Sequence, residues 1–129
     1  MTIEELARQN HAQALRFMAI AGPAANLAQA LALTAPDSCF EHYGLQPING
    51  RYISLPLAAW LTDMSLDGSS VRYQNPIVFT GDDPDRFLIK TAIHENGGKK
   101  HLILEMLFDR GQLVRLRETR NPCEALSET

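Results

Sequence analysis

The stretch that decides the fold is residues 86–120, which reads RFLIKTAIHENGGKKHLILEMLFDRGQLVRLRETR. Its apolar residues recur at every second position, which is the period of a β-strand with one buried face. Two runs of turn-forming residues, at 96–98 and 109–111, interrupt this alternation. The stretch therefore predicts an antiparallel run of three strands, over residues 86–95, 100–108 and 112–120.

Opposite charges indicate how the first two of these strands pair. With Gly97 and Gly98 as a two-residue hairpin loop, three oppositely charged pairs face each other. They are Glu95 with Lys100, Lys90 with Glu105 and Arg86 with Asp109. The same register predicts a face that helices cover, made of Phe87, Ile89, Thr91, Ile93, Leu102, Leu104, Met106 and Phe108.

The opposite face of these two strands is mixed rather than fully polar. The register puts His94 and His101 side by side on it. The other residues of this face are Leu88, Ala92, Ile103 and Leu107. Such a surface predicts a homodimer contact, and the alternative is that a terminal segment covers it. The two histidines do not predict a metal site, because a third ligand is missing from any nearby position.

The last strand has two alternative registers. A three-residue loop gives Gly111 the left-handed geometry it tolerates and turns Val114, Leu116 and Glu118 toward the core. Glu105 then faces Arg115 on the outside. A two-residue loop would instead bury Arg115 and the arginine two positions later, which is costly without partners. The three-residue loop is therefore the prediction.

The residues before this stretch begin with two helices. Thr2 and Glu5 form a capping box ahead of an apolar pattern at helical spacing. Gly22-Pro23 ends that helix, because proline lacks an amide proton and disfavours helical geometry in the residue before it. A short second helix follows and runs through Leu31.

Two strands and a third helix complete the chain. A strand is predicted over residues 38–43, a helix from about Ser54 with Pro56 in its first turn, and a strand over residues 70–79. Pro76 within the latter strand implies a bulge or a sheet edge. The sequence thus predicts a single α+β domain over residues 1–129, with three helices in its first half packed on an antiparallel sheet.

The composition excludes several classes of function. The formal net charge is −3 and both signs are interspersed, which disfavours nucleic acid as a partner. The two cysteines, Cys39 and Cys123, predict reduced thiols in the cytoplasm rather than a disulfide framework or a zinc site. Residues 17–35 carry no charge, but Gly22-Pro23 interrupts them, so no membrane span is predicted. No phosphate loop or nucleophile motif occurs, so no cofactor is expected.

The order of elements resembles the nuclear transport factor 2-like superfamily, which includes SnoaL-like cyclases and ketosteroid isomerases. The local likeness is carried by residues 107–119, which read LFDRGQLVRLRET, and by residues 37–50. The resemblance implies a cone (the cystatin-like α+β roll), in which a strongly curved sheet wraps around the helices. It also implies an apolar pocket for a small hydrophobic ligand, and dimers formed through the outer sheet face.

Two residues are predicted to carry acid/base chemistry in such a pocket. His42 lies on the same side of its strand as Phe40, where an imidazole could act as a general base. Glu118 is the one carboxylate that the register places on the concave face. The alternatives are a core histidine bonded to the backbone and a glutamate paired with an arginine.

Five further residues are predicted to contact the ligand, namely Phe40, Trp60, Tyr73, Met106 and Asn121. The Tyr73 hydroxyl could donate to a ligand oxygen, whereas core packing is the commoner role of such aromatic residues. SnoaL-like enzymes often carry an acid just after the Arg-Leu-Arg-Glu-like run, and this sequence has Asn121 there. That departure leaves open whether the chain is an enzyme.

Two functions of different class follow from these residues. The first is a small-molecule pocket protein that uses His42 and Glu118 to isomerise, cyclise or hydrate an apolar carbonyl compound. The second is a non-catalytic interaction or carrier module that forms a homodimer. The surface expected to form that dimer consists of Leu88, His94, His101, Ile103 and Leu107.

Overall fold

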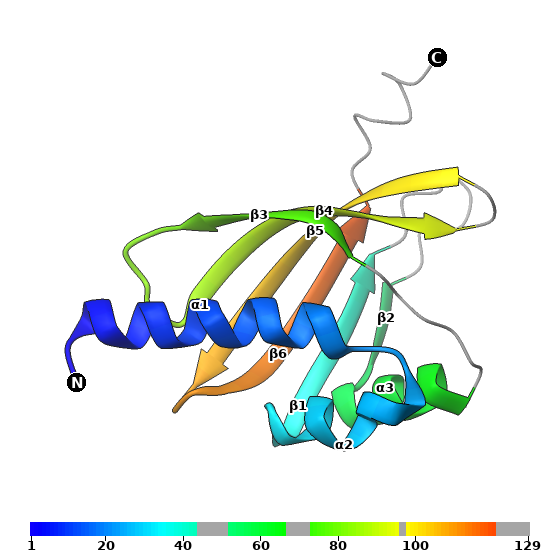
Figure 1. Ribbon diagram of the computed structural model, residues 1–129, viewed down its shortest axis with the longest axis horizontal. Coiled ribbons are helices and arrows are strands. Elements are labelled where there is room, and N and C mark those ends of the chain that lie inside the picture. Colours follow the sequence, from blue (N-terminus) through cyan, green and yellow to red (C-terminus); the bar gives the residue numbers. More distant parts are fainter. Residues whose placement is uncertain (44–51, 67–72, 96–97, 121–129) are drawn as a thin grey trace.

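The computed structural model describes residues 1–43, 52–66, 73–95 and 98–120. Three helices lie on one side of a six-stranded curved sheet (Figure 1). The helices are α1 (Ile3–Ile20), α2 (Leu27–Ala32) and α3 (Leu57–Leu66), with a short 3-10 turn η1 (Ala24–Asn26) before α2. The strands are β1 (Thr34–Tyr43), β2 (Tyr52–Pro56), β3 (Gln74–Thr80), β4 (Arg86–Glu95), β5 (Gly98–Asp109) and β6 (Gln112–Arg120). The predicted cone-shaped α+β class is confirmed.

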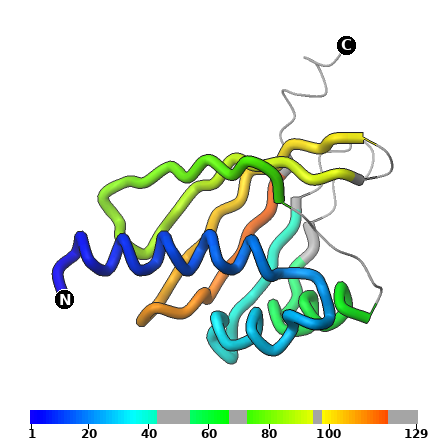
Figure 2. Tube along the Cα trace, in the orientation of Figure 1, coloured from blue at the N-terminus to red at the C-terminus, as the bar shows by residue number. Residues whose placement is uncertain are grey.

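The strand order is β2-β1-β6-β5-β4-β3, which brings the two halves of the chain together in the middle of the sheet (Figure 2). β1 pairs with β6 in parallel, while the other described pairs are antiparallel. The sheet is therefore mixed, and the prediction of a wholly antiparallel sheet is wrong in this detail. The parallel contact joins strands far apart in sequence, so no hairpin signal announces it.

Helix α1 lies across the sheet and supplies much of the core. Thr2 caps it by accepting a hydrogen bond from the Glu5 amide at 3.1 Å, as the capping box predicts. Ala14, Phe17 and Met18 pack into a cluster with residues of β4, β5 and β6. Buried Asn10 ties the middle of the helix to the segment before β4, because its side-chain amide donates to the Pro84 carbonyl and to the Asp85 carboxylate, both at 3.0 Å. No described helix is both long and apolar enough to span a membrane.

In the first half of the chain, several helix and strand boundaries differ from those predicted. β1 begins at Thr34 rather than at residue 38. Residues 54–56, which were predicted as the first turn of a helix, belong instead to β2, which pairs with β1 from Tyr43↔Tyr52 to Cys39↔Pro56. Sheet pairing thus overrides the helix-start signal of Pro56. Pro76 does lie at an irregularity on the edge strand β3, where the pairing is interrupted between Gln74 and Ile77.

The register of β4 and β5 differs from the prediction by two residues. Glu95 pairs with Gly98 rather than with Lys100, and Leu88 pairs with Glu105. A shift of two keeps every side chain on its predicted face, because the side-chain period of a strand is two. Arg86, which the prediction paired with Asp109, instead binds Glu105 diagonally, with Nε to Oε2 at 2.8 Å. The histidines His94 and His101 share a face, but they pair with Lys99 and Ala92 and are not directly opposite each other.

The last hairpin has the two-residue turn that the charge argument disfavoured. Arg110 and Gly111 both adopt left-handed geometry, with φ of 53° and 80°, and Asp109 pairs with Gln112. A bulge then restores the predicted faces, because Leu107 pairs with Arg115 while Phe108 pairs with Leu113. Leu113, Leu116 and Glu118 are buried on the core side, whereas Val114 is only partly buried. Glu105 consequently opposes Arg117 instead of Arg115.

Candidate functional site

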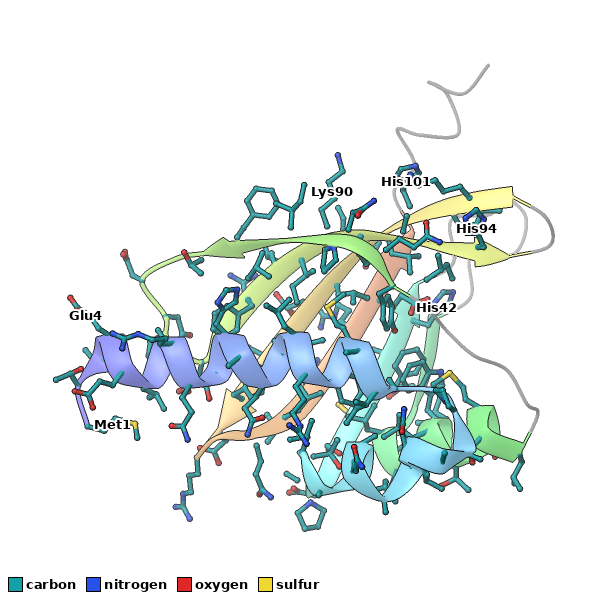
Figure 3. All side chains as sticks on the ribbon, in the orientation of Figure 1. Met1, Glu4, His42, Lys90, His94 and His101 are labelled. Carbon is teal, nitrogen blue, oxygen red and sulfur yellow. The ribbon has the colours of Figure 1, made fainter. Side chains whose placement is uncertain are left out.

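The two predicted acid/base residues meet on the inner face of the sheet, where β1 and β6 run side by side. The parallel register pairs Phe40 with Leu116 and His42 with Glu118. The His42 Nδ1 atom lies 3.1 Å from Glu118 Oε1, and the two side chains are 19% and 11% exposed. Among the described residues no arginine pairs with Glu118. Figure 3 shows His42 on the helix side of the sheet.

An aromatic row leads from helix α3 to the pair of His42 and Glu118. Trp60 of α3 stacks on Phe40, with ring centroids 4.1 Å apart and ring planes within 9° of parallel. The His42 ring lies next in the row, 6.5 Å from the Phe40 centroid at an angle of 18°. Phe40 is buried, while Trp60 is partly buried. The imidazole therefore lies at the end of a stack of nearly parallel aromatic rings.

Tyr73 precedes β3 and packs against the same core. Its hydroxyl oxygen is closed to solvent and has no hydrogen-bond partner among the described residues. Burial, and then the negative charge of Glu118, raise the pKa of the Tyr73 phenol well above its usual value. The phenol is therefore protonated at neutral pH and keeps a hydrogen to donate.

The remaining predicted ligand contacts have different positions. Met106 is fully buried in the core and pairs with Phe87 and Leu116, two positions along β5 from the partner of Glu118. Asn121 lies outside the described residues. Ser38 was not predicted as a site residue, but it is buried and its hydroxyl has no partner among the described residues. Ser38 precedes Phe40 by two positions on β1, so the alternation that puts Phe40 and His42 on the inner face also predicts Ser38 there.

The outer face behind this site carries a row of charged side chains. We call it the outer charge row, and it consists of Glu41, Arg115, Arg117, Glu105 and Arg86. The carboxylate of Glu41 is only 3% exposed and accepts a hydrogen bond from Arg115 Nε, while Arg117 Nη2 lies 3.4 Å from its other oxygen. Hydrogen bonding to Glu41 raises the pKa of Arg115.

The outer charge row links four adjacent strands. Arg117 Nη1 lies 3.6 Å from Glu105 Oε1, and Glu105 in turn binds Arg86. Glu41 precedes His42 on β1, and Arg117 precedes Glu118 on β6. The outer ion pairs thus hold the register of the same two strands that carry the inner pair.

The rest of the outer face is partly apolar. Leu88 and Ile103, predicted for a dimer surface, are 37% and 38% exposed. Ile77 and Phe79 of β3 extend this surface and are 56% and 55% exposed. We call these four residues the outer apolar patch. His94 and His101 project from the side of the sheet opposite α1 (Figure 3).

The described residues do not form a metal-binding cluster. No group of three or more histidine, cysteine, aspartate or glutamate side chains among them could hold a metal ion. The groups that the inner site offers are an imidazole, a carboxylate and a phenol beside a stack of aromatic rings.

Comparison with known proteins finds similarity in structure only. No protein-family model matches the sequence, and no curated protein sequence matches it. A phenazine biosynthesis-related protein from Pseudomonas aeruginosa is similar with a TM-score of 0.73 at 21% identity, over 97% of this chain and 87% of that chain.

Two other solved structures extend this comparison. An NTF2-like (nuclear transport factor 2-like) protein of unknown function from Cytophaga hutchinsonii has a TM-score of 0.65 at 15% identity, over 91% of this chain and 94% of that chain. A protein from Xanthomonas campestris, provisionally described as a polyketide cyclase, has a TM-score of 0.64 at 14% identity, over 95% and 97%. At these identities the likeness concerns the fold.

Proposed function

Because this chain has the nuclear transport factor 2-like fold, we propose that its concave face binds a small apolar carbonyl compound and that His42 and Glu118 transfer a proton on it. The observation that carries the proposal is the 3.1 Å contact between the imidazole and the carboxylate. The phenazine-related and cyclase-like neighbours bear names from small-molecule metabolism, which supports this class of reaction. Isomerisation, cyclisation and hydration all need such a transfer.

The two members of this pair have different roles. We place a proton on His42 Nδ1, because an ionised carboxylate 3.1 Å away can only accept hydrogen bonds. That tautomer leaves the lone pair on Nε2 free to take a proton from a ligand. Glu118 then holds the ring orientation and stabilises the imidazolium that forms. His42 is the general base in this proposal, and Glu118 is the residue that positions it.

The surroundings suit a flat apolar ligand. The rings of Trp60, Phe40 and His42 lie in nearly parallel planes, one stacked on the next, so aromatic side chains flank the imidazole on one side. Both ionisable side chains are largely shielded from water, which strengthens the charge interactions between them. A bicyclic aryl ketone such as 1-tetralone matches this chemistry and serves as a probe.

Proton transfer can be tested without knowing the natural substrate. In D₂O the wild-type protein should accelerate exchange of the C2 protons of 1-tetralone, followed as loss of their NMR signal. His42→Ala should lower the protein-dependent rate by about a hundredfold, a typical contribution of a general base. Glu118→Gln should lower it by at least about tenfold, because an amide does not stabilise the imidazolium.

His94→Ala is the matched control, since His94 lies on the opposite face of the sheet (Figure 3). Its exchange rate should equal that of the wild type. Thermal melting of each variant separates loss of the base from loss of the fold. Equal exchange by folded His42→Ala and wild-type protein would contradict the assignment.

We also propose that the protein forms a homodimer through the outer face. The outer apolar patch supports this, because it gathers four large apolar side chains on three neighbouring strands. Leu88→Asp should convert a dimer into a monomer on size-exclusion chromatography with light scattering. Ile3→Asp, at a 69% exposed position on α1, should leave the mass unchanged. A monomeric wild-type protein would rule out the dimer.

A further inference from the structure

The carboxylate of Glu41 is buried on the outer face of the sheet, in the same strand pair that carries His42 and Glu118. It is 3% exposed, and its two oxygens contact different arginines, Oε1 with Arg115 and Oε2 with Arg117. Charge-assisted hydrogen bonds offset the lost hydration of a buried carboxylate only while their geometry holds. Apolar side chains of similar volume often stabilise a protein as well as such a cluster does. The contribution of Glu41 is therefore better sought in the arrangement that it specifies.

The pairing of β1 with β6 needs a feature that specifies its register. The described ladder is irregular before Cys39 and regular over residues 39–43. Parallel pairs are slightly less stable per residue than antiparallel ones, and no tight hairpin turn sets which residues meet. In the observed register Arg117 lies opposite Glu41, and Arg115 lies two positions earlier on β6. A slip of two residues in either direction would leave only one arginine in those two positions.

The outer and inner pairs occupy consecutive positions of this ladder. Glu41 is opposite Arg117, and the next residues, His42 and Glu118, are opposite each other. Side chains of consecutive strand residues point to opposite faces, so the first pair lies outside and the second inside. A slip of two residues would remove Glu118 from His42 and break the 3.1 Å contact between them. The register that gives Glu41 both arginines is therefore the one that gives the imidazole its carboxylate.

We propose that Glu41 is a positioning residue for His42, which acts from the outer face by holding β1 and β6 in the register that brings the imidazole to Glu118. This inference rests on the proposed function, since the rate of proton transfer is one of its two readouts. It goes further by giving a part in that reaction to a buried carboxylate on the other face of the sheet. The second readout is the tautomer of His42, which is measured without a ligand.

The test variant is Glu41→Gln, which keeps the size of the side chain. A glutamine has one acceptor oxygen, so it binds one arginine while its NH₂ group faces the donors of the other. One of the two contacts with β6 is then lost, and the contact between His42 and Glu118 loosens. Long-range ¹H–¹⁵N NMR spectra, recorded at a pH where the imidazole is neutral, show which ring nitrogen carries the proton.

The wild type should carry this proton on His42 Nδ1. Glu41→Gln should show a mixture of the two tautomers, because the hydrogen bond that selects Nδ1 is weakened. The kcat for exchange of the 1-tetralone protons should fall about tenfold, since a small displacement of a reacting group slows a reaction. KM should stay within about twofold, because the aromatic row beside the imidazole is unchanged.

Arg86→Met is the matched control. Arg86 belongs to the outer charge row but binds Glu105, on strands that do not include β1 or β6. Its tautomer and kcat should equal those of the wild type. The same tautomer mixture in Arg86→Met would overturn the inference, because the effect would then not be specific to Glu41.

Thermal melting establishes that each variant is folded. If Glu41→Gln does not fold, the combination of Glu41→Leu, Arg115→Met and Arg117→Met replaces it, because it removes the buried charge together with these two arginines. Its apolar side chains attract one another without direction and so do not specify a register. The same tautomer mixture is expected from it.

The tautomer decides between the possible outcomes. A folded test variant that keeps the proton on His42 Nδ1 as fully as the wild type overturns the inference, whatever its rate. A wild type with the proton on Nε2 overturns it together with the roles proposed for His42 and Glu118. If the variant shows the mixture but the wild type does not accelerate exchange, Glu41 retains its positioning role and the proposed proton transfer fails.

Discussion

Replacing Arg115 and Arg117 together with methionine should lower the free energy of unfolding by about 3–5 kcal/mol, measured by urea denaturation. The reason is the carboxylate of Glu41, which is 3% exposed and loses the guanidinium groups of Arg115 and Arg117 in this variant. Taking counter-charges away from a buried charge is strongly unfavourable. The two arginines are about one-third exposed, so the loss comes from Glu41 rather than from them.

A triple variant is the matched control. Adding Glu41→Leu to the two methionine substitutions removes the buried charge and leaves an apolar cluster in its place. Stability should then return to within about 1–2 kcal/mol of the wild type, because exchanging a whole buried ion cluster for apolar residues is often neutral or favourable. If the triple variant is as unstable as the double one, the arginines act through packing instead of charge.

Phe17→Ala should destabilise the protein by about 3–5 kcal/mol, the range expected for removing a buried phenylalanine ring. Phe17 is 1% exposed and is the largest side chain that α1 contributes to the core. Its removal leaves a cavity between the helix and the sheet that the neighbouring side chains cannot fill without moving. The measurement is urea denaturation. A lower midpoint with an unchanged m-value shows that only the stability of the folded state has changed.

Leu15→Ala tests the same helix without the cavity. Leu15 is 37% exposed, and alanine favours helix formation as well as leucine does. Its substitution should cost less than about 1 kcal/mol. If both variants lose a similar free energy of unfolding, the Phe17 ring is not what holds α1 on the sheet. The stability of the helix itself, from its length and capping, would then be the cause.

The sequence predicts which face a strand residue occupies better than it predicts its partner. Alternation put Glu118 on the inner face correctly, although the hairpin loop on which that assignment was based is wrong. The bulge at Val114 compensates for the shorter turn. Charge pairing predicted the wrong register for β4 and β5. A long arginine side chain can bind a carboxylate diagonally across two strands, as Arg86 binds Glu105, and does not need one directly opposite.

The inner site depends on the contact between β1 and β6, which no sequence pattern predicts. Alternation within β1 put His42 beside Phe40, and alternation within β6 put Glu118 inside, but neither pattern indicates that the two strands are neighbours. Their parallel pairing joins residues more than seventy positions apart, and no single hairpin turn connects the two strands. The resemblance to the nuclear transport factor 2-like superfamily supplied the fold. The 3.1 Å contact required coordinates.

The parallel pairing of β1 with β6 also fixes the order in which the site can assemble. During synthesis, at about 5–20 residues per second, β1 emerges several seconds before β6. Until then β2 is the one sheet neighbour of β1 that has been made. The contact between β1 and β6 therefore closes last and carries a large loop-closure entropy cost. A nascent chain that stops before residue 112 has neither a complete sheet nor a paired His42, so the site is gained only together with the finished fold.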